Sequence, residues 1–336
     1  MNIAVIGSGG WGLAMAKCMA ERGHAVAVWS HKPETTAMLR EHRCNPRLLR
    51  GVAMPESIRF TDDLTCAQGC PIVVIAVPSF AVAETARKLA PILEAGQLLV
   101  LLSKGFDLQH NCCLLSDTVA REVGERCPVV ALTGPSHAEE VSRGIPTAVL
   151  AASPDRAAAE QVQAALVSDT FRVYTSPDIV SAELGGAMKN IMAVAVGISD
   201  GYGYGDNTKA MLMTRGLTEI ARLGVAMGAQ KDTLAGLAGI GDLIVTCTSM
   251  HSRNRRAGIL IGKGYTPEKA MEEVGAVVEG YYATKSAWEL GQKMGVDMPI
   301  VDAAYRVLYR GESAAEAVRQ LLNRPGVAEQ EDAGWL

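Results

Sequence analysis

The stretch Asn2-Ile-Ala-Val-Ile-Gly-Ser-Gly-Gly-Trp-Gly12 indicates the fold of the first half of the chain. The four apolar residues before its first glycine are typical of a parallel strand that is buried on both faces. Gly7, Gly9 and Gly12 then have the spacing G-x-G-x-x-G, which allows a tight turn, close backbone approach to a pyrophosphate and close helix-to-sheet packing. The alternative is a glycine-rich turn without a ligand. The strand before the motif and the helix expected after it favour a dinucleotide site at the helix N-terminus.

Length and composition indicate a two-domain globular protein. The chain has 336 residues, of which 49% are hydrophobic and 20% charged, so it can bury a large core. The net charge of -4 argues against non-specific binding to nucleic acid or to a membrane surface, because phosphate contacts need clustered positive charge. The expected partners are therefore small molecules.

The cysteines are expected to be free thiols in the cytoplasm. There are eight of them, without a C-x-x-C pair or the regular histidine spacing of a metal site. The N-terminus begins a strand rather than a signal peptide, and no stretch of 18 uninterrupted apolar residues occurs. We therefore predict no bound metal, no stable membrane insertion and a cytoplasmic location.

The first half of the chain alternates between strand and helix patterns, which predicts a Rossmann-like, doubly wound α/β domain over residues 1–176. Up to the strand at 98–102, the alternation also predicts parallel strands with right-handed crossovers. Beyond the first strand, further strands are expected at 25–29, 72–77, 98–102, 129–132, 145–151 and 171–174. Residues 177–323 instead show helical periodicity and predict an all-α substrate and catalytic domain, and residues 324–336 predict a loose tail.

The end of the second expected strand favours NADPH over NADH. An acidic residue usually binds the ribose 2′-hydroxyl at this point of a Rossmann fold. This chain has His31 and Lys32 there, and Glu34 lies further on. Basic and polar side chains suit a 2′-phosphate, although a solvated surface turn would have the same composition.

Two lysines are candidates for chemistry. Lys104 follows the strand at 98–102, so it should overhang the crevice of the sheet. Lys189 stands in the run Leu184-Gly-Gly-Ala-Met-Lys-Asn190, where paired glycines predict close approach to another domain or a ligand. A partly desolvated lysine near a second cation has a lowered pKa and suits proton transfer near neutral pH. The alternative is a surface lysine whose stem packs on apolar residues.

Polar groups in the second half supply the other candidates. Asp242 and Thr246 lie four residues apart and share a face if their segment is helical; the alternative is an N-capping aspartate and a core threonine. Ser252-Arg-Asn-Arg-Arg256 is a basic cluster whose arginine forks suit phosphate, or else a solvated helix start. Glu279, beside a glycine, is either a cap or a ligand contact.

Seven motifs together resemble the bacterial NAD(P)-dependent glycerol-3-phosphate dehydrogenases. They are Gly-Ser-Gly-Gly-Trp-Gly, Ser-Lys-Gly, Gly-Pro-Ser-His-Ala, Leu-Gly-Gly-Ala-Met-Lys-Asn, Gly-Ile-Gly-Asp-Leu, Ser-Arg-Asn-Arg-Arg and Val-Val-Glu-Gly, in the order and spacing of that family from Asn2 to about Leu322. The resemblance implies reversible reduction of dihydroxyacetone phosphate to sn-glycerol 3-phosphate, a precursor of phospholipids, with NADPH or NADH as cofactor. A homodimer is an expectation that no residue pattern tests.

The resemblance also implies residue roles. Lys189 would transfer the proton, Lys104 and Asn190 would polarise the carbonyl and hold the substrate, and Asp242 would orient Lys189 with Thr246 nearby. The substrate would also contact Gly134, Ser136, Ser252, Arg253 and Asn254. The cofactor would contact Gly7, Gly9, Gly10, Trp11, Gly12, His31, Lys32, Lys104, Ala138, Arg253, Val277 and Glu279.

Two residues depart from the family pattern. Gly10 stands where a serine or alanine is common, and Leu13 stands where threonine is common. These changes bear on cofactor affinity rather than on the reaction. Two other functions stay open from the residues: a dehydrogenase of the same plan acting on another small hydroxy acid or carbonyl, and a non-catalytic NADPH-sensing module.

Overall fold

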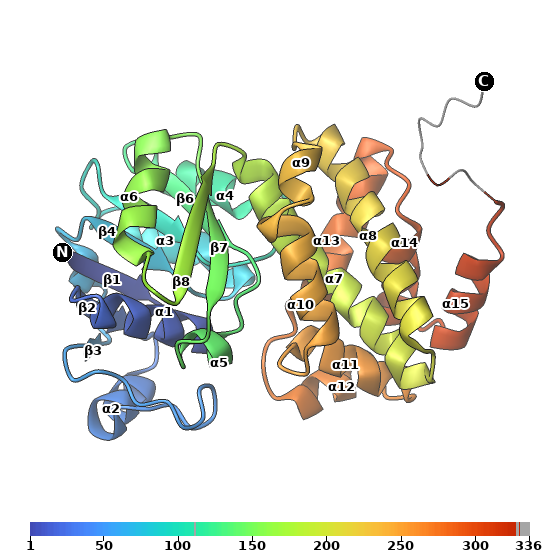
Figure 1. Cartoon of the computed structure of the whole chain (residues 1–336), viewed down its shortest axis with the longest axis horizontal. Helices are drawn as coiled ribbons and strands as arrows, with labels where there is room; N and C mark the ends of the chain where they lie inside the picture. Colours follow the sequence, from blue (N-terminus) through green and yellow to red (C-terminus); the bar gives the residue numbers. More distant parts are fainter. Residues whose placement is uncertain (111, 327–328, 330–336) are drawn as a thin grey trace.

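One eight-stranded sheet organises the first half of the chain (Figure 1). The computed structural model describes residues 1–110, 112–326 and 329. The strand order is β3-β2-β1-β4-β5-β6-β7-β8, and the first six strands in this order repeat the 3-2-1-4-5-6 arrangement of a Rossmann sheet. The predicted fold class is therefore confirmed. The bounds are β1 Asn2–Ile6, β2 Ala25–Trp29, β3 Arg59–Thr61, β4 Ile72–Ile75, β5 Leu98–Leu101, β6 Val129–Thr133, β7 Thr147–Ala152 and β8 Phe171–Ser176.

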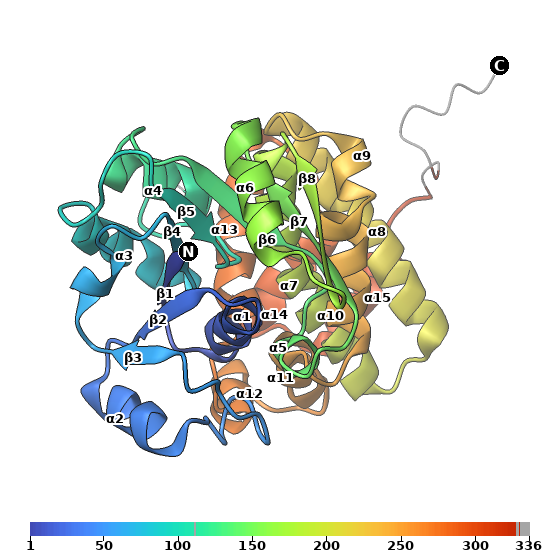
Figure 2. The same cartoon turned by 60° about the vertical axis from the view of Figure 1, so that its left-hand side comes forward.

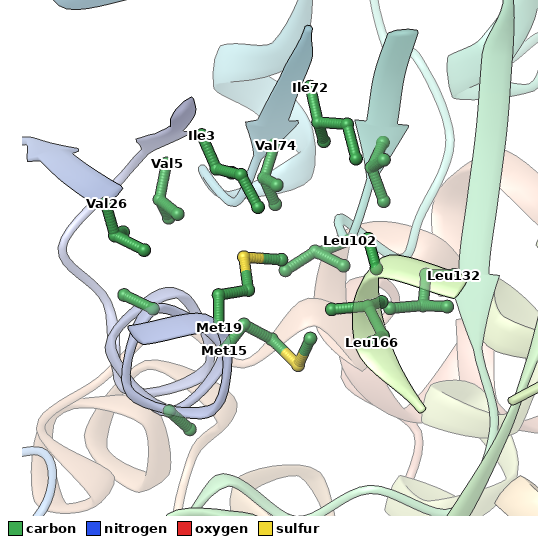
Figure 3. Packing of buried hydrophobic residues seen from close by; sticks show 14 of the residues in the cluster. Ile3, Val5, Met15, Met19, Val26, Ile72, Val74, Leu102, Leu132 and Leu166 are labelled. Atoms are coloured by element: carbon green, nitrogen blue, oxygen red, sulfur yellow. The ribbon is translucent and has the colours of Figure 1, made fainter. Parts of the chain in front are cut away.

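Helices cover both faces of this sheet, because its central strands are apolar at almost every position. In β1, Ile3 and Val5 belong to a core shared with α1 and α6, whereas Ala4 and Ile6 belong to a second core shared with α3 and α4. Figure 3 shows methionines of α1 packed against strand residues of the first core. The bounds are α1 Gly10–Glu21, α2 Pro33–His42, α3 Val82–Leu89, α4 Leu115–Val123, α5 Ala138–Val141 and α6 Arg156–Leu166.

The sheet differs from the sequence-based expectation in several strand limits and in the direction of one strand pairing. The short edge strand β3 was not predicted, and β4 ends at Ile75 rather than at 77. The strand expected at 145–151 is β7, which begins at Thr147 and pairs antiparallel with β6. A parallel crossover needs a dozen or more residues and usually a full helix. The link from β6 to β7 holds only the four-residue α5, so the chain turns back instead.

The second half is a helical bundle around α7 (Figures 1 and 2). Between residue 177 and residue 326, no described residue lies in a strand. The domain boundary at residue 176 stays a prediction, and most of the predicted tail at 324–336 lies outside the described residues. The bounds are α7 Ile179–Tyr202, α8 Asp206–Ala226, α9 Lys231–Leu234, α10 Asp242–Thr248, α11 Arg253–Gly262, α12 Pro267–Val274, α13 Glu279–Met294, α14 Pro299–Tyr309 and α15 Ala314–Leu322, with a π-helical turn at Leu237–Gly241.

Helix α7 is the core of this bundle. By length and composition it could cross a membrane, but 83% of its most apolar window is buried inside the structure. Its contact with α11 is backbone against backbone: a Cβ added to Gly197 would lie 2.2 Å from the Arg255 carbonyl oxygen, and one added to Gly258 would lie 2.2 Å from that of Val194. Only glycine permits this approach, which brings the N-terminus of α11 close to the middle of α7.

Candidate functional site

The glycine turn after β1 has the geometry that its spacing predicts. Gly7 has φ +125°, and an added Cβ would lie 2.6 Å from the Ala76 carbonyl oxygen. A Cβ on Gly12 would lie 2.3 Å from the Gly7 carbonyl oxygen, whereas a Cβ on Gly9 would meet no atom within 4 Å. Gly9 is also the N-cap of α1 and brings no side chain to the first-turn N–H groups. No side-chain cap therefore occupies the first-turn N–H groups, and the turn fits a dinucleotide pyrophosphate.

Gly10 and Leu13 leave this turn intact. A Cβ on Gly10 would lie 3.5 Å from the Leu48 carbonyl oxygen and 3.8 Å from the Ala138 side chain, which is ordinary contact. Ala138 therefore lies beside the turn, on the side predicted for the cofactor. Leu13 is fully buried in the core below α1, where the threonine common in the family would expose a hydroxyl to apolar neighbours.

The end of β2 carries no acidic side chain toward the crevice. Ser30 is buried and accepts a hydrogen bond from the Ser8 hydroxyl at 2.9 Å, which ties this strand end to the glycine turn. His31 and Lys32 follow as exposed residues, and Lys32 is the N-cap of α2. Glu34 lies in the first turn of α2, away from the strand end. The residues that directly follow β2 therefore include the cation Lys32 and no carboxylate.

Four predicted residues meet in one buried ion-pair network between the sheet and the bundle. Lys189 of α7 donates to Asp242 Oδ1 at 2.5 Å and to the Thr246 hydroxyl at 2.8 Å. Lys104, just after β5, donates to Asp242 Oδ2 at 2.6 Å and to the Gly134 carbonyl oxygen at 3.2 Å. Asp242 and Thr246 share one face of α10, so one carboxylate joins two lysines from different halves of the chain.

Glycines allow these segments to come so close. A Cβ on Gly185 would lie 2.4 Å from the Ala238 carbonyl oxygen, and one on Gly186 would lie 3.4 Å from the Lys104 stem. The paired glycines before Lys189 therefore permit close approach of the other domain, as their position predicts. Ala238 belongs to the π-helical turn that leads directly into Asp242. Such turns are frequent at functional sites.

Burial and charge set the protonation of this network. Burial, helped by the positive charge of Lys104 and opposed by the negative charge of Asp242, lowers the pKa of Lys189 from 10.5 to about 8. Burial alone would raise the pKa of Asp242, but the two ammonium groups outweigh it and hold that pKa below its usual value. The network therefore combines an anionic aspartate with a lysine that can exchange its proton near neutral pH.

Asn190 and Asn254 form a second buried pair beside Lys189. Asn254 Nδ2 donates to Asn190 Oδ1 at 2.9 Å, and Asn190 Nδ2 donates to the Gly186 carbonyl oxygen at 3.3 Å. The Asn254 Oδ1 accepts the backbone N–H of Gly280 at 2.8 Å. The amides of α7 and α11 are thus fixed in orientation by each other.

The residues of the basic cluster predicted at 252–256 make different contacts in the structure. Ser252 caps α11 by accepting the Arg255 backbone N–H, and Arg255 itself is paired with Asp200 at 2.6 Å. Arg256 donates to the Val274 carbonyl oxygen. Arg253 is exposed at the start of α11, so it is the arginine of this cluster that can meet an anion at the helix N-terminus.

The remaining predicted residues lie in segments that follow the sheet strands or in the bundle near them. Ser136 donates to the Gly134 carbonyl oxygen, which also accepts from Lys104. Glu279 begins α13 and accepts from the Ser79 hydroxyl at 2.6 Å, while Val277 precedes it as a half-buried residue. Trp11 is half-buried against the core. The contact with Ser79 was not predicted, although its place after β4 matches that of Lys104 after β5.

The fold and the lysine–aspartate network together are those of a two-domain, dinucleotide-dependent dehydrogenase. A Rossmann sheet offers an open glycine turn at its crevice, and a helical half brings a buried, proton-exchanging lysine to the carboxyl end of the same sheet. This plan serves several substrates, so the fold alone does not select one.

Comparison with known proteins gives the family. Residues 2–159 and 178–319 match the N-terminal and C-terminal models of NAD-dependent glycerol-3-phosphate dehydrogenase. The glycerol-3-phosphate dehydrogenase [NAD(P)+] of Moorella thermoacetica is 50% identical over 99% of both chains, and that of Geobacillus kaustophilus is 48% identical over 98% of this chain and 97% of its own. A crystal structure of glycerol-3-phosphate dehydrogenase from Coxiella burnetii is similar with TM-score 0.93 and 37% identity, covering 96% of this chain and 99% of that chain. The chain belongs to the NAD-dependent glycerol-3-phosphate dehydrogenase family.

Proposed function

We propose that the protein catalyses the reversible reduction of dihydroxyacetone phosphate to sn-glycerol 3-phosphate with NADPH or NADH. The observation that carries this proposal is the buried Lys189–Asp242–Lys104 network, which lies between the bundle and the carboxyl ends of the sheet strands. The family membership supports the same reaction.

Lys189 is the proton donor in this proposal. A nicotinamide cofactor held at the glycine turn of Gly7, Gly9 and Gly12 would supply the hydride that the carbonyl carbon C2 takes up. Lys189 Nζ supplies the proton to the carbonyl oxygen, so that one hydride and one proton convert the ketone to an alcohol. Asp242 keeps the ammonium group oriented through its 2.5 Å hydrogen bond. In the oxidative direction the neutral amine of Lys189 takes the proton back from the alcohol.

The neighbouring groups hold the substrate. Lys104 is 2.6 Å from Asp242 and supplies a second positive charge at the developing alkoxide. Asn190, fixed by Asn254, presents the adjoining amide. Ser252, Arg253 and Asn254 at the N-terminus of α11 bind the phosphate, because backbone N–H groups, the helix dipole and a guanidinium all favour a dianion there. Gly134 and Ser136 contact the substrate from the sheet side, next to Lys104.

The substrate assignment is tested by oxidation of NADPH with dihydroxyacetone phosphate and, separately, with unphosphorylated dihydroxyacetone. We expect turnover with the phosphorylated ketone and a value of kcat/KM at least about 100-fold lower with the other, because a missing charged partner leaves Arg253 and its neighbours unpaired. Equal turnover of both ketones would favour a dehydrogenase with another substrate. Binding of NADPH without any turnover would favour a sensing module.

The direction of the pH dependence follows from Lys189. Its pKa of about 8 means that the protonated form needed for reduction is lost as the pH rises through 8. The neutral form needed for oxidation is gained over the same interval. We therefore expect kcat for ketone reduction to fall above about pH 8 and kcat for alcohol oxidation to rise. Parallel profiles in the two directions, measured at saturating substrate, would contradict this role for Lys189.

NADPH is the preferred cofactor in this proposal. His31 and Lys32 are exposed at the end of β2, where an acidic residue would otherwise repel a 2′-phosphate. We expect His31→Asp to shift the ratio of kcat/KM values toward NADH by about tenfold or more, since like charges face each other in the NADPH complex. A ratio that stays the same would mean that His31 does not contact the 2′-phosphate. Lys88→Asp, on the exposed surface of α3, is the matched charge-change control.

We further propose that the enzyme works in the cytoplasm and supplies glycerol 3-phosphate for phospholipid synthesis. Support comes from its proposed product and its family. Assembly as a homodimer belongs to the same proposal and is tested by measuring the molar mass in solution.

A further inference from the structure

Ser79 links the sheet to the helical bundle beside Lys104. It follows β4 and is 4% exposed. Its hydroxyl donates to Glu279 Oε2 at 2.6 Å, and its backbone N–H donates to Glu279 Oε1 at 3.2 Å. Glu279 is the first residue of α13. The carboxylate of one half of the chain is therefore held by both donors of a single serine from the other half.

From Glu279 the contacts run through the bundle to Lys189. The next residue, Gly280, donates its backbone N–H to Asn254 Oδ1 at 2.8 Å. Asn254 donates in turn to Asn190 Oδ1 at 2.9 Å, and Asn190 is adjacent to Lys189 on α7. A Cβ added to Gly280 would lie 2.4 Å from the Asn190 carbonyl oxygen, so α13 cannot move toward α7 and can shift only by giving up these bonds.

The contacts return to Ser79 through the lysines. Lys189 and Lys104 share the carboxylate of Asp242, and Gly105 follows Lys104. A Cβ on Gly105 would lie 2.6 Å from the Ser79 Cβ, which means that Ser79 packs directly on the backbone beside Lys104. The residues from Ser79 through Glu279, Asn254, Lys189 and Asp242 to Lys104 thus form a closed circuit of contacts between the sheet and the bundle.

We propose that Ser79 is a positioning residue, which closes this circuit and so fixes Asn254 and Lys104 relative to Lys189. This inference rests on the proposed function, because it concerns the residue that keeps the reacting groups of that reaction in place. Glu279 is suited to this task because its two carboxylate oxygens accept both Ser79 hydrogen bonds. Burial raises its pKa, while the two donors of Ser79 and the positive charge of Arg253 oppose that rise, so the hydroxyl helps to keep the carboxylate charged and in place.

The chain contains a matched control at Ser116. This buried serine, in the first turn of α4, donates its hydroxyl and its backbone N–H to Glu183 of α7, with 3.0 Å for the backbone bond. Glu183 is buried more deeply than the half-buried Glu279, and burial raises the pKa of Glu183 to about 7. The pair joins the same two halves of the chain but lies outside the circuit. Ser116→Ala therefore removes a similar hydroxyl without changing the contacts of the residues in the circuit.

The first test compares Ser79→Ala with Ser116→Ala in steady-state kinetics with NADPH and dihydroxyacetone phosphate. We expect Ser79→Ala to lower kcat about tenfold with KM for the ketone changed less than about threefold, because small misplacements of reacting groups cost rate. Ser116→Ala should keep kcat within about twofold even if both variants lose a similar amount of thermal stability. Equal changes of kcat in the two variants would overturn the proposal.

The second test needs neither substrate nor cofactor. Hydrogen–deuterium exchange of the Gly280 amide in the ligand-free protein reports whether α13 is held on Asn254. We expect Ser79→Ala to speed this exchange at least about tenfold, which corresponds to about 1.4 kcal/mol of local opening, and Ser116→Ala to leave it unchanged. Unchanged exchange in Ser79→Ala would overturn the positioning role. Failure of the wild-type protein to reduce dihydroxyacetone phosphate would instead overturn the proposed function and leave this exchange result standing.

Discussion

Lys189→Ala is expected to lower kcat for dihydroxyacetone phosphate reduction by about 10²- to 10⁴-fold, the usual contribution of a positioned general acid. Lys189 lies in α7, and its ammonium group is 2.5 Å from Asp242 and 2.8 Å from the Thr246 hydroxyl. None of these residues touches the glycine turn after β1. The dissociation constant for NADPH, measured by fluorescence titration, should therefore change less than about threefold.

The control for this prediction is Lys209→Ala. Lys209 of α8 is also paired with aspartates, at 2.9 Å from Asp206 and 3.4 Å from Asp200, but it is outside the network at the cleft. It should keep nearly normal turnover. Near-normal turnover in Lys189→Ala would refute the role of Lys189 as proton donor. Loss of NADPH affinity in the same variant would mean that Lys189 instead stabilises the local structure at the cofactor site.

Gly258→Ala is expected to destabilise the helical half by about 3 kcal/mol or more, at the upper end of the usual cost of overpacking. The added methyl would lie 2.2 Å from the Val194 carbonyl oxygen and 2.9 Å from the Gly197 Cα. Both atoms are backbone, so no side chain can rotate away, and α11 must move off α7. Thermal unfolding should shift down by roughly 6–12 °C for a domain of this size.

This displacement should also reduce activity, because Ser252, Arg253 and Asn254 begin the helix that would move. Gly205→Ala is the matched control: Gly205 is the N-cap of α8, and a Cβ there would meet no atom within 4 Å. Its melting temperature should stay close to that of the wild type. A Gly258→Ala protein with wild-type stability and KM would mean that the helix crossing tolerates more separation than its geometry implies.

Local patterns predicted the parts of the fold and site that depend on neighbouring residues. The apolar run at Ile3 to Ile6 and the glycines after it need only a few residues to specify a buried strand and a turn, and both formed as expected. The pairing of Lys189 with Asp242 was predicted through the family resemblance, since 53 residues separate the two along the chain. The roles assigned to these residues stay predictions until the kinetics are measured.

Other features could not be predicted because they depend on contacts between distant segments. The antiparallel direction of β7 follows from the shortness of α5, which periodicity does not report. The bond between Ser79 and Glu279 joins residues 200 positions apart, and each looks locally like a simple turn or cap. The π-helical turn before Asp242 depends on close packing that no local propensity specifies.

The burial of α7 has a consequence for biosynthesis. This helix is made directly after the sheet, yet the partners that cover it include α11 and α13, which end at Gly262 and Met294. On the ribosome, the sheet half can therefore fold while a long apolar helix still waits for the segments that shield it. We expect nascent chains arrested before residue 253 to bind chaperones through α7, and chains released after residue 294 to escape them.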